Sequence, residues 1–196
     1  MKPALLDAIQ QRYACREFLA GKPLSTDELA VLLEAGRLAP SAFGLEPWRF
    51  VTVTDTAAKT AIAHACFDQP AATSAAAFIA IVALVDALEP DSDYVHARFT
   101  AETRGQDMGT IYDAYRPHYK SSSIAAWAQG QCNFSAAHIL LQAASLNLGS
   151  CPIGGFDPDL MAAALSVSPG ETPALVIALG HCKDAAPKRM RKSLDY

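Results

Sequence analysis

Basic side chains gather in two widely separated parts of a chain that is acidic overall. Arg12 and Arg16 stand four residues apart near the start of the sequence. The last fourteen residues hold two acidic residues and five basic ones, namely Lys183, Lys188, Arg189, Arg191 and Lys192. The planar fork of arginine donates two parallel hydrogen bonds and suits phosphate. The two groups together could therefore bind one small anionic ligand, although a solvated tail that aids solubility is the plainer interpretation.

Two loops rich in glycine or proline are further candidates for binding. Residues 149–156 (GSCPIGGF) include consecutive glycines, which let the backbone approach a flat ligand and offer it N–H groups. Residues 39–48 (APSAFGLEPW) could present Ser41, backbone amides and the ring of Phe43. Taken alone, the first loop also fits an ordinary turn after a helix. The second also fits a proline-punctuated connection between two elements.

The standard nucleophile and phosphate-loop motifs are absent from the sequence, among them G-x-S-x-G, G-x-x-x-x-G-K-[ST], H-E-x-x-H and G-x-G-x-x-G. A metal-dependent hydrolase is the rival enzyme class, with candidate ligands Asp91, Asp93, His96 and His118. The spacing of these four residues fits no common metal motif, and a solvated polar segment explains them more simply. His138 is interpreted as a satisfied buried histidine, and Cys151 as a thiol without an adjacent base.

The composition indicates a folded protein with part of its surface covered. Of 196 residues, 51% are hydrophobic and 18% are charged, and the net charge is −4. This balance excludes intrinsic disorder and a generally basic nucleic-acid binder. The longest apolar run, residues 75–85, is too short to span a membrane, and the first residues carry Asp7 and no signal-peptide pattern. We therefore expect a soluble oligomer that associates with neither nucleic acid nor membrane.

The cysteines predict a reducing compartment. There are five, at positions 15, 66, 132, 151 and 182, and no two of them form a C-x-x-C pair. An odd number at wide spacing argues against a disulfide framework and against a zinc site. We accordingly expect a cytoplasmic protein whose cysteines are thiols and which holds no metal.

The patterning predicts a single domain over residues 1–196, of the α+β class because helices and strands intermix without regular β-α-β alternation. Ser25 and Glu28 form a capping box, and Asp157 followed by Pro158 begins a later helix. Helices are expected at residues 4–11, 25–37, 56–65, about 109–115, 123–148 and from 158 onward. Strands are expected at 48–54, 78–85 and 174–179. Loops are expected at 40–47, 67–70 and 149–156, with a mobile stretch within 86–120.

The missing charges are concentrated in one part of the chain. Residues 121–156 contain no Asp, Glu, Lys or Arg. The long helix expected at 123–148 is therefore apolar nearly all round and must be buried all round.

Several segments together resemble the flavin-dependent nitroreductase family. In chain order they are R-Y-A-C-R-E-F at 12–18, L-A-P-S-A-F-G-L-E-P-W-R-F at 38–50, Trp127, Gln131, S-C-P-I-G-G-F-D at 150–157 and P-K-R-M-R at 187–191. They follow the family's order over essentially the whole chain. The resemblance implies a three-layer α/β/α fold around a central, mostly antiparallel sheet. It also implies that FMN binds at the interface of an intertwined, obligate homodimer with two equivalent sites.

The resemblance assigns flavin-binding roles to particular residues. The segment that holds the phosphate, ribityl chain and ring edge corresponds to Arg12, Tyr13, Ala14 and Arg16. The basic tail residues that complete the phosphate site correspond to Lys188 and Arg191, with Arg189 as the alternative for the second. The amide near the polar edge of the ring corresponds to Gln69. The loop against the isoalloxazine ring corresponds to Pro152, Ile153, Gly154 and Gly155. The segment supplied by the other subunit corresponds to Pro40, Ser41 and Ala42.

Five positions depart from residues that many family members carry. Ala14 stands in place of Ser, Gly44 of Asn, Glu46 of Gln and Gly154 of Glu, and Ala72 stands where a basic residue is common. These departures bear on nicotinamide and substrate preference, and flavin binding is still expected.

The activity implied is reduction of a small electron-poor acceptor by NAD(P)H through FMN, in a ping-pong reaction that passes hydride through flavin N5. Nitroaromatics, quinones and activated alkenes are the expected acceptors, and the cofactor carries the chemistry without a catalytic side chain. Phe43, Tyr112 and Tyr115 are predicted to line the acceptor slot. A flavin-binding protein without turnover is the alternative, ahead of the metal-dependent hydrolase.

Overall fold

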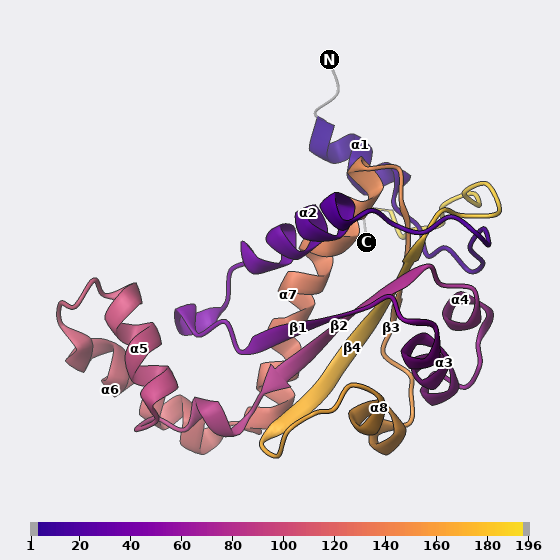
Figure 1. Ribbon diagram of the computed structural model, residues 1–196. Coiled ribbons are helices and arrows are strands. Elements are labelled where there is room, and N and C mark those ends of the chain that lie inside the picture. The colour runs from indigo at the N-terminus through magenta and orange to yellow at the C-terminus, as the bar shows by residue number, and fades with distance from the viewer. Residues whose placement is uncertain (1–3, 194–196) are drawn as a thin grey trace.

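The computed structural model describes residues 4–193 and builds them around a four-stranded antiparallel sheet of strand order β1-β2-β4-β3 (Figure 1). The strands are β1 (Trp48–Val53), β2 (Ala77–Leu84), β3 (Gly149–Ile153) and β4 (Glu171–Gly180). Seven of the eight residues of β2 are buried, as are the last six of β4. A continuous apolar strand of this kind is covered on both faces.

The structure confirms three expected strands and corrects one expected loop. Residues 149–153 form β3 at one edge of the sheet, where Cys151 pairs with Ala178 of β4. Pro152 and the nearby glycines made this segment look like a turn. Proline is tolerated here because an edge strand needs hydrogen bonds on one side only.

Helices cover both faces of the sheet, which confirms the three-layer α/β/α arrangement (Figure 1). One layer contains α1 (Ala4–Gln11), α2 (Thr26–Arg37) and α7 (Ile124–Ser145). The other contains α3 (Thr56–Ala65), α4 (Pro70–Thr73) and α8 (Pro158–Ala164). Ile79 and Ile81 of β2 face the α7 layer, whereas Phe78 and Ala80 face the α3 layer.

The helix caps confirm the local sequence signals. The Ser25 hydroxyl accepts from the Glu28 amide at 3.2 Å, and the Glu28 carboxylate accepts from the Ser25 amide at 2.7 Å. Asp157 accepts from the first two free amides of α8, each at 3.0 Å. Such caps satisfy donors that a helix cannot satisfy internally.

Residues 86–120 contain more helix than the sequence predicted. They contain the short 3-10 turn η2 (Asp86–Leu88) and two helices, α5 (Asp93–Glu102) and α6 (Met108–Ser121), which project from one end of the molecule (Figure 1). The helix α6 confirms and extends the one expected at about 109–115, whereas the charged residues around α5 hide its periodicity. The stability of both helices comes from aromatic packing: Phe99 and Tyr115 are fully buried, with ring centroids 5.4 Å apart.

The long helix α7 is not buried all round within one chain. Its buried side packs under the sheet, but Ala126, Gly130, Phe134 and Ala137 remain exposed. These four are spaced by four, four and three residues, so they form one uncharged stripe along the helix. No helix within residues 4–193 combines the length and apolarity needed to cross a membrane. The expectation that α7 is buried all round is therefore wrong for the single chain.

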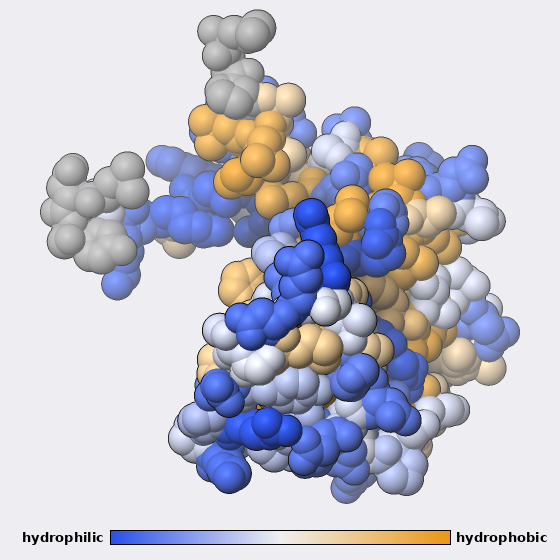
Figure 2. Space-filling model, turned by 90° about the vertical axis from the view of Figure 1, so that its left-hand side faces the viewer, coloured by the Kyte–Doolittle hydropathy of each residue, from blue (hydrophilic) through white to orange (hydrophobic). Residues whose placement is uncertain are grey.

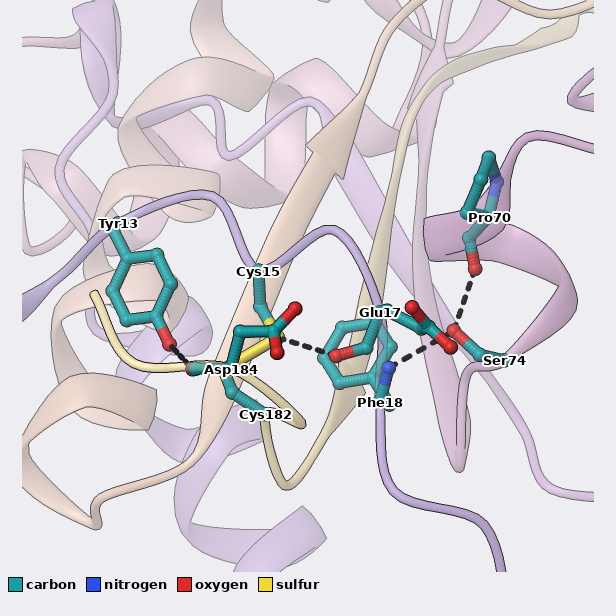
Figure 3. Close-up of a disulfide and its surroundings, with 8 residues drawn as sticks. All are labelled: Tyr13, Cys15, Glu17, Phe18, Pro70, Ser74, Cys182 and Asp184. Atoms are coloured by element: carbon teal, nitrogen blue, oxygen red, sulfur yellow. Dashed lines mark hydrogen bonds between the residues drawn. A yellow bond between two sulfur atoms is a disulfide. The ribbon is translucent and has the colours of Figure 1, made fainter. Parts of the chain in front are cut away.

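The expectation that all cysteines are thiols is wrong for one pair. Cys15 and Cys182 are joined in a disulfide, although 167 positions separate them in sequence (Figure 3). They meet because the segment after α1 forms a bridge to Ser150 through Ala14 and another to Cys182 through Phe18. Cys66, Cys132 and Cys151 are free and buried, and burial raises the pKa of the Cys66 thiol to about 11.

Candidate functional site

The two groups of basic residues meet in the structure. Residues 10–16 and the returning tail, residues 186–191, enclose a pocket of about 390 Å³. Five basic side chains line it, namely Arg12, Arg16, Lys188, Arg189 and Arg191. Within the described part of the chain, no acidic residue lines this pocket. Such a concentration of positive charge is suited to an anion.

The electrostatics of the pocket point the same way. Burial lowers the pKa of the Arg12 guanidinium, and the positive charges of Arg189 and Arg191 lower that pKa further. Arg189 is already engaged, since it donates to the backbone carbonyl oxygens of Gln10 and Arg12. The cations of Arg12 and Arg191 therefore repel each other, and a bound anion would offset that repulsion.

Strand β3 places the amino-terminal segment beside the Gly-Gly loop. The Cys15 amide donates to the Ser150 carbonyl at 3.0 Å, and an Arg16 guanidinium nitrogen lies 3.8 Å from the Cys151 sulfur. Residues 152–155 follow directly. The structure thus brings together three of the predicted binding groups: residues 12–16, the basic tail and the loop after β3.

The loop after β3 leaves open room above its backbone. Gly154 and Gly155 are exposed, and a side chain built on either would meet no atom within 4 Å. Pro152 is also exposed, whereas Ile153 is buried in the core. A flat ligand could lie against this backbone, which fits an isoalloxazine ring.

Gln69 lies at the beginning of α4, next to the same region. Its side-chain amide donates to the Cys66 carbonyl at 3.0 Å. The short helix α4 is tied to the amino-terminal segment because the Phe18 amide donates to the Ser74 hydroxyl at 3.0 Å (Figure 3). The Asp157 amide donates to the Ala65 carbonyl at 2.8 Å, which holds the loop after β3 against the end of α3.

The remaining predicted binding residues lie elsewhere in the chain. Pro40, Ser41 and Ala42 belong to the loop before β1, where the Ala42 amide donates to the side-chain oxygen of Gln131 at 2.9 Å. This loop lies near α5 and the first half of α7, away from the ends of the chain (Figure 1). One chain therefore holds the predicted site residues in two separate places.

The aromatic residues predicted to line an acceptor slot lie near that loop. Phe43 packs against Tyr115 and His118, with centroid distances of 5.2 and 5.5 Å. Tyr112 is partly buried, and the Arg116 guanidinium lies 4.8 Å from its ring centroid. Tyr115 is fully buried and its hydroxyl donates to the Leu88 carbonyl at 2.6 Å. This corrects the expectation for Tyr115, a core residue with no surface to offer a substrate.

The loop before β1 is held in an unusual backbone conformation. Phe43, Gly44 and Glu46 all have positive φ values, of 58°, 62° and 42°. Such values are strained for Phe and Glu and persist only when surrounding contacts hold them. Arg98 supplies contacts from α5, donating to the Gly44 carbonyl at 2.9 Å and to the Glu46 carboxylate. Tyr94 adds bonds of 2.8 Å to the carbonyls of Leu45 and Glu46.

The candidate metal ligands do not assemble into a site. Asp91 is paired with Arg116 at 2.8 Å, and His118 shares a 3.3 Å hydrogen bond with Ser122. Among residues 4–193, no three potential ligands lie close enough to hold a metal ion. The His138 Nδ1 atom lies 3.3 Å from the Ala35 carbonyl oxygen. Burial raises the pKa of the Cys151 thiol, and the nearby charge of Arg16 opposes that shift.

Comparisons with known proteins decide the family. A model of the nitroreductase family matches residues 9–181. The chain belongs to the nitroreductase family. An NADH dehydrogenase of Thermus thermophilus is 36% identical over 161 residues, which is 81% of this chain and 78% of that one. An oxygen-insensitive NADPH nitroreductase of Helicobacter pylori is 29% identical over 94% of this chain and 90% of its own.

Solved structures share this nitroreductase fold. A protein of Exiguobacterium sibiricum described as a nitroreductase, in complex with FMN, superimposes with a TM-score of 0.81 at 20% identity. That match covers all of this chain and 96% of the other. The enone reductase CLA-ER gives a TM-score of 0.77 at 24% identity, covering 97% of this chain and 94% of the other. At these identities, the likeness concerns the fold.

Sequence reasoning missed Arg98 and Tyr94 as residues that hold the loop before β1. Both lie on α5, a helix that the charge pattern concealed. The sequence did mark this loop, since Gly44 and Glu46 are residue types that differ from those of many family members. In the structure both residues have positive φ values and both accept hydrogen bonds from Arg98.

We predict that Arg98→Ala lowers the free energy of unfolding by about 1–2 kcal/mol, because two partly buried charge-assisted bonds are lost. It should also speed hydrogen exchange of amides in residues 42–48. Arg37→Ala is the matched control, since it removes a well-exposed pair with Glu34 and should change the free energy of unfolding much less. Urea titration and exchange mass spectrometry measure both. Equal effects of the two variants would contradict this role for Arg98.

Proposed function

We propose that this nitroreductase-family protein is an FMN-dependent NAD(P)H oxidoreductase that reduces small electron-poor acceptors. Nitroaromatics, quinones and activated alkenes are the acceptor classes. The observation that carries the proposal is the pocket between Arg12 and the basic tail, beside the open Gly154–Gly155 backbone. It offers positive charge for a phosphate and an exposed surface for a flat ring. We place the activity in the cytoplasm, where NAD(P)H is supplied.

The residues present fit FMN. Arg12, Arg16, Lys188 and Arg191 would hold the phosphate, while the bonds of Arg189 to the backbone keep the tail against the amino-terminal segment. Arginines that repel one another in the free pocket gain most from a dianionic partner. Tyr13 and Ala14 continue the same segment toward β3. The backbone amide of their neighbour Cys15 donates a hydrogen bond to the Ser150 carbonyl.

When bound, FMN supplies the hydride chemistry, and the protein supplies binding, orientation and polarity. In the proposed role, Gly154 and Gly155 present their backbone to the ring without side chains in the way. The amide of Gln69, held by Cys66, serves the polar edge. No protein nucleophile is needed, which agrees with the absence of nucleophile motifs from the sequence.

The relatives bear on the reductant and the acceptor. One is named for NADPH and another for NADH. We propose that NADH or NADPH serves as the reductant. The fold neighbour named as an enone reductase makes activated alkenes a reasonable acceptor class beside nitro compounds and quinones. Phe43 and Tyr112 are the proposed acceptor-contacting aromatics.

We also propose that the protein acts as an intertwined, obligate homodimer. The exposed stripe of α7 includes Phe134, which is half exposed. Beside it lies an open groove of about 570 Å³ between α1, α2 and α7, lined by nine residues of which none is acidic, lysine or arginine in the described chain. Leu5 and Leu38 are both more than 60% exposed on it. Figure 2 shows hydrophobic side chains gathered over α1 in the upper part of the view.

A second copy would resolve two observations at once. It would cover this apolar face, which a monomer rarely exposes. It would also allow Pro40, Ser41 and Ala42 of one chain to approach the basic pocket of the other, as the family resemblance implies. The separation of the site residues within one chain supports this arrangement.

FMN affinity tests the phosphate pocket. We predict that Arg12→Ala and Arg16→Ala each weaken FMN binding about tenfold or more, because each removes a charge-assisted contact of about 1.5–3 kcal/mol. Riboflavin lacks the phosphate, so its weaker binding should be nearly insensitive to both substitutions. Lys120→Ala, an exposed cation on α6, is the control and should leave FMN binding unchanged. Fluorescence titration measures all four proteins. Equal losses for FMN and riboflavin would contradict a phosphate role.

Dimer stability tests the open face of α7. We predict that Phe134→Glu weakens self-association by about tenfold or more, because it places a charge in an apolar interface. Leu160→Glu is the matched control: Leu160 is similarly exposed, at 44% against 50%, but lies on α8 across the sheet. Sedimentation equilibrium distinguishes them. A monomeric native protein, or a Phe134 variant that dimerises normally, would contradict the proposal.

A further inference from the structure

Cys182 lines a second cleft. This cleft has a volume of about 510 Å³ and shares Gln11, Arg12, Tyr13 and Ala186 with the basic pocket. Arg12, Lys22 and His181 line it, and no acidic residue of the described chain does so. It therefore offers a positively charged approach to one sulfur of the disulfide.

The disulfide is built into the packing around β3. A side chain at Gly149 would collide with the sulfurs of both Cys15 and Cys182, so glycine leaves the space that the pair occupies. Main-chain bonds lie on either side, from the Leu19 amide to the His181 carbonyl at 2.8 Å and from the Lys183 amide to the Glu17 carbonyl at 3.0 Å. Figure 3 shows the disulfide between these two segments.

The two sulfurs differ in what can reach them. Cys15 is 2% exposed, whereas Cys182 is only partly buried and lines the cleft. An attacking thiolate would therefore meet Cys182 first and expel Cys15. The Cys15 sulfur lies 3.2 Å from the Glu17 carbonyl oxygen, which can accept a hydrogen bond from a Cys15 thiol. The site thus accommodates both the disulfide and the product of its opening.

We propose that Cys182 is a thiol-exchange site for a small anionic thiol of the glutathione class, and that exchange there unlatches the tail from the amino-terminal segment. In the first step the thiolate bonds to the Cys182 sulfur, the Cys15–Cys182 bond breaks, and Cys15 leaves as a thiolate that takes a proton. A second thiolate then attacks the mixed disulfide and leaves a Cys182 thiol. Two thiols are oxidised to one disulfide, and the protein disulfide is reduced to two thiols.

The consequence for the basic pocket follows from what remains after the covalent bond opens. The tail is then held by noncovalent contacts alone. They are the Lys183–Glu17 ion pair at 2.6 Å, the main-chain bond between the same two residues at 3.0 Å, the bond from the Tyr13 hydroxyl to the Asp184 carbonyl at 2.8 Å, and the bonds of Arg189 to the carbonyls of Gln10 and Arg12. The exposed ion pair among these contacts stabilises the attached tail only weakly. The basic residues that follow in the tail would be held less firmly, so FMN would leave faster. This part of the inference rests on the proposed function.

Peptide mapping tests the exchange site without any flavin. Digestion without reductant should give one peptide pair linked through Cys15 and Cys182. After brief treatment with glutathione, the adduct should reside on Cys182 and the free thiol on Cys15. Glutathione should react faster than cationic cysteamine at equal thiolate concentration, and Lys22→Gln should reduce that preference. Absence of the linked pair, an adduct on Cys15, or equal rates for the two thiols would overturn the site.

FMN release tests the latch. We expect FMN to dissociate roughly fivefold faster from the glutathione-treated protein than from the disulfide form. This ratio corresponds to a loss of about 1 kcal/mol in the free energy that holds FMN in the pocket. Cys182→Ser should release FMN at the faster rate with or without glutathione. Cys132→Ala, a buried free cysteine of α7, should keep the response. Equal release rates from the mapped disulfide and thiol forms would overturn the latch. If neither form binds FMN, the proposed function fails, while the peptide map still decides the exchange site.

Discussion

Main-chain pairing of the segment after α1 is the interaction on which the site depends. Residues 14–19 pair with β3 on one side and with the end of β4 on the other, through bonds from Cys15 to Ser150 and from Leu19 to His181. This double pairing carries Arg12 and Arg16 from the start of the chain to the basic tail. Without it, the cations would remain two solvated groups at opposite ends of a sequence.

Charged residues are distributed unevenly in this acidic protein. Cations gather where burial and mutual repulsion already lower the pKa of Arg12, an arrangement that costs free energy until an anion enters. Charges are absent where α7 runs beneath the sheet and presents an apolar stripe outward. The low charge content of the chain is therefore concentrated along α7, whose exposed stripe is the surface that the proposed second copy would cover.

Local signals made much of this fold predictable, whereas distant contacts did not. The capping box at Ser25 and the Asp157–Pro158 pair fixed their helices correctly, because a cap involves neighbours only. Strand β3 was missed because Pro152 favours a turn until an edge position permits it. The disulfide was missed because Cys15 and Cys182 meet only through tertiary pairing. The sequence suggested that Arg12 and the tail could meet at one anion. It did not identify Arg98 and Tyr94, which hold the loop before β1, because they lie on a helix that was not predicted.

Anaerobic addition of NADH or NADPH to the FMN-loaded protein tests the central claim most directly. Hydride transfer reduces the flavin, so the account predicts that the yellow absorbance bleaches with at least one coenzyme and returns when a quinone or nitroaromatic is added. Absorbance that persists with both coenzymes would contradict an oxidoreductase and leave a flavin-binding protein without turnover. A protein that takes up no FMN at all would contradict the phosphate pocket itself.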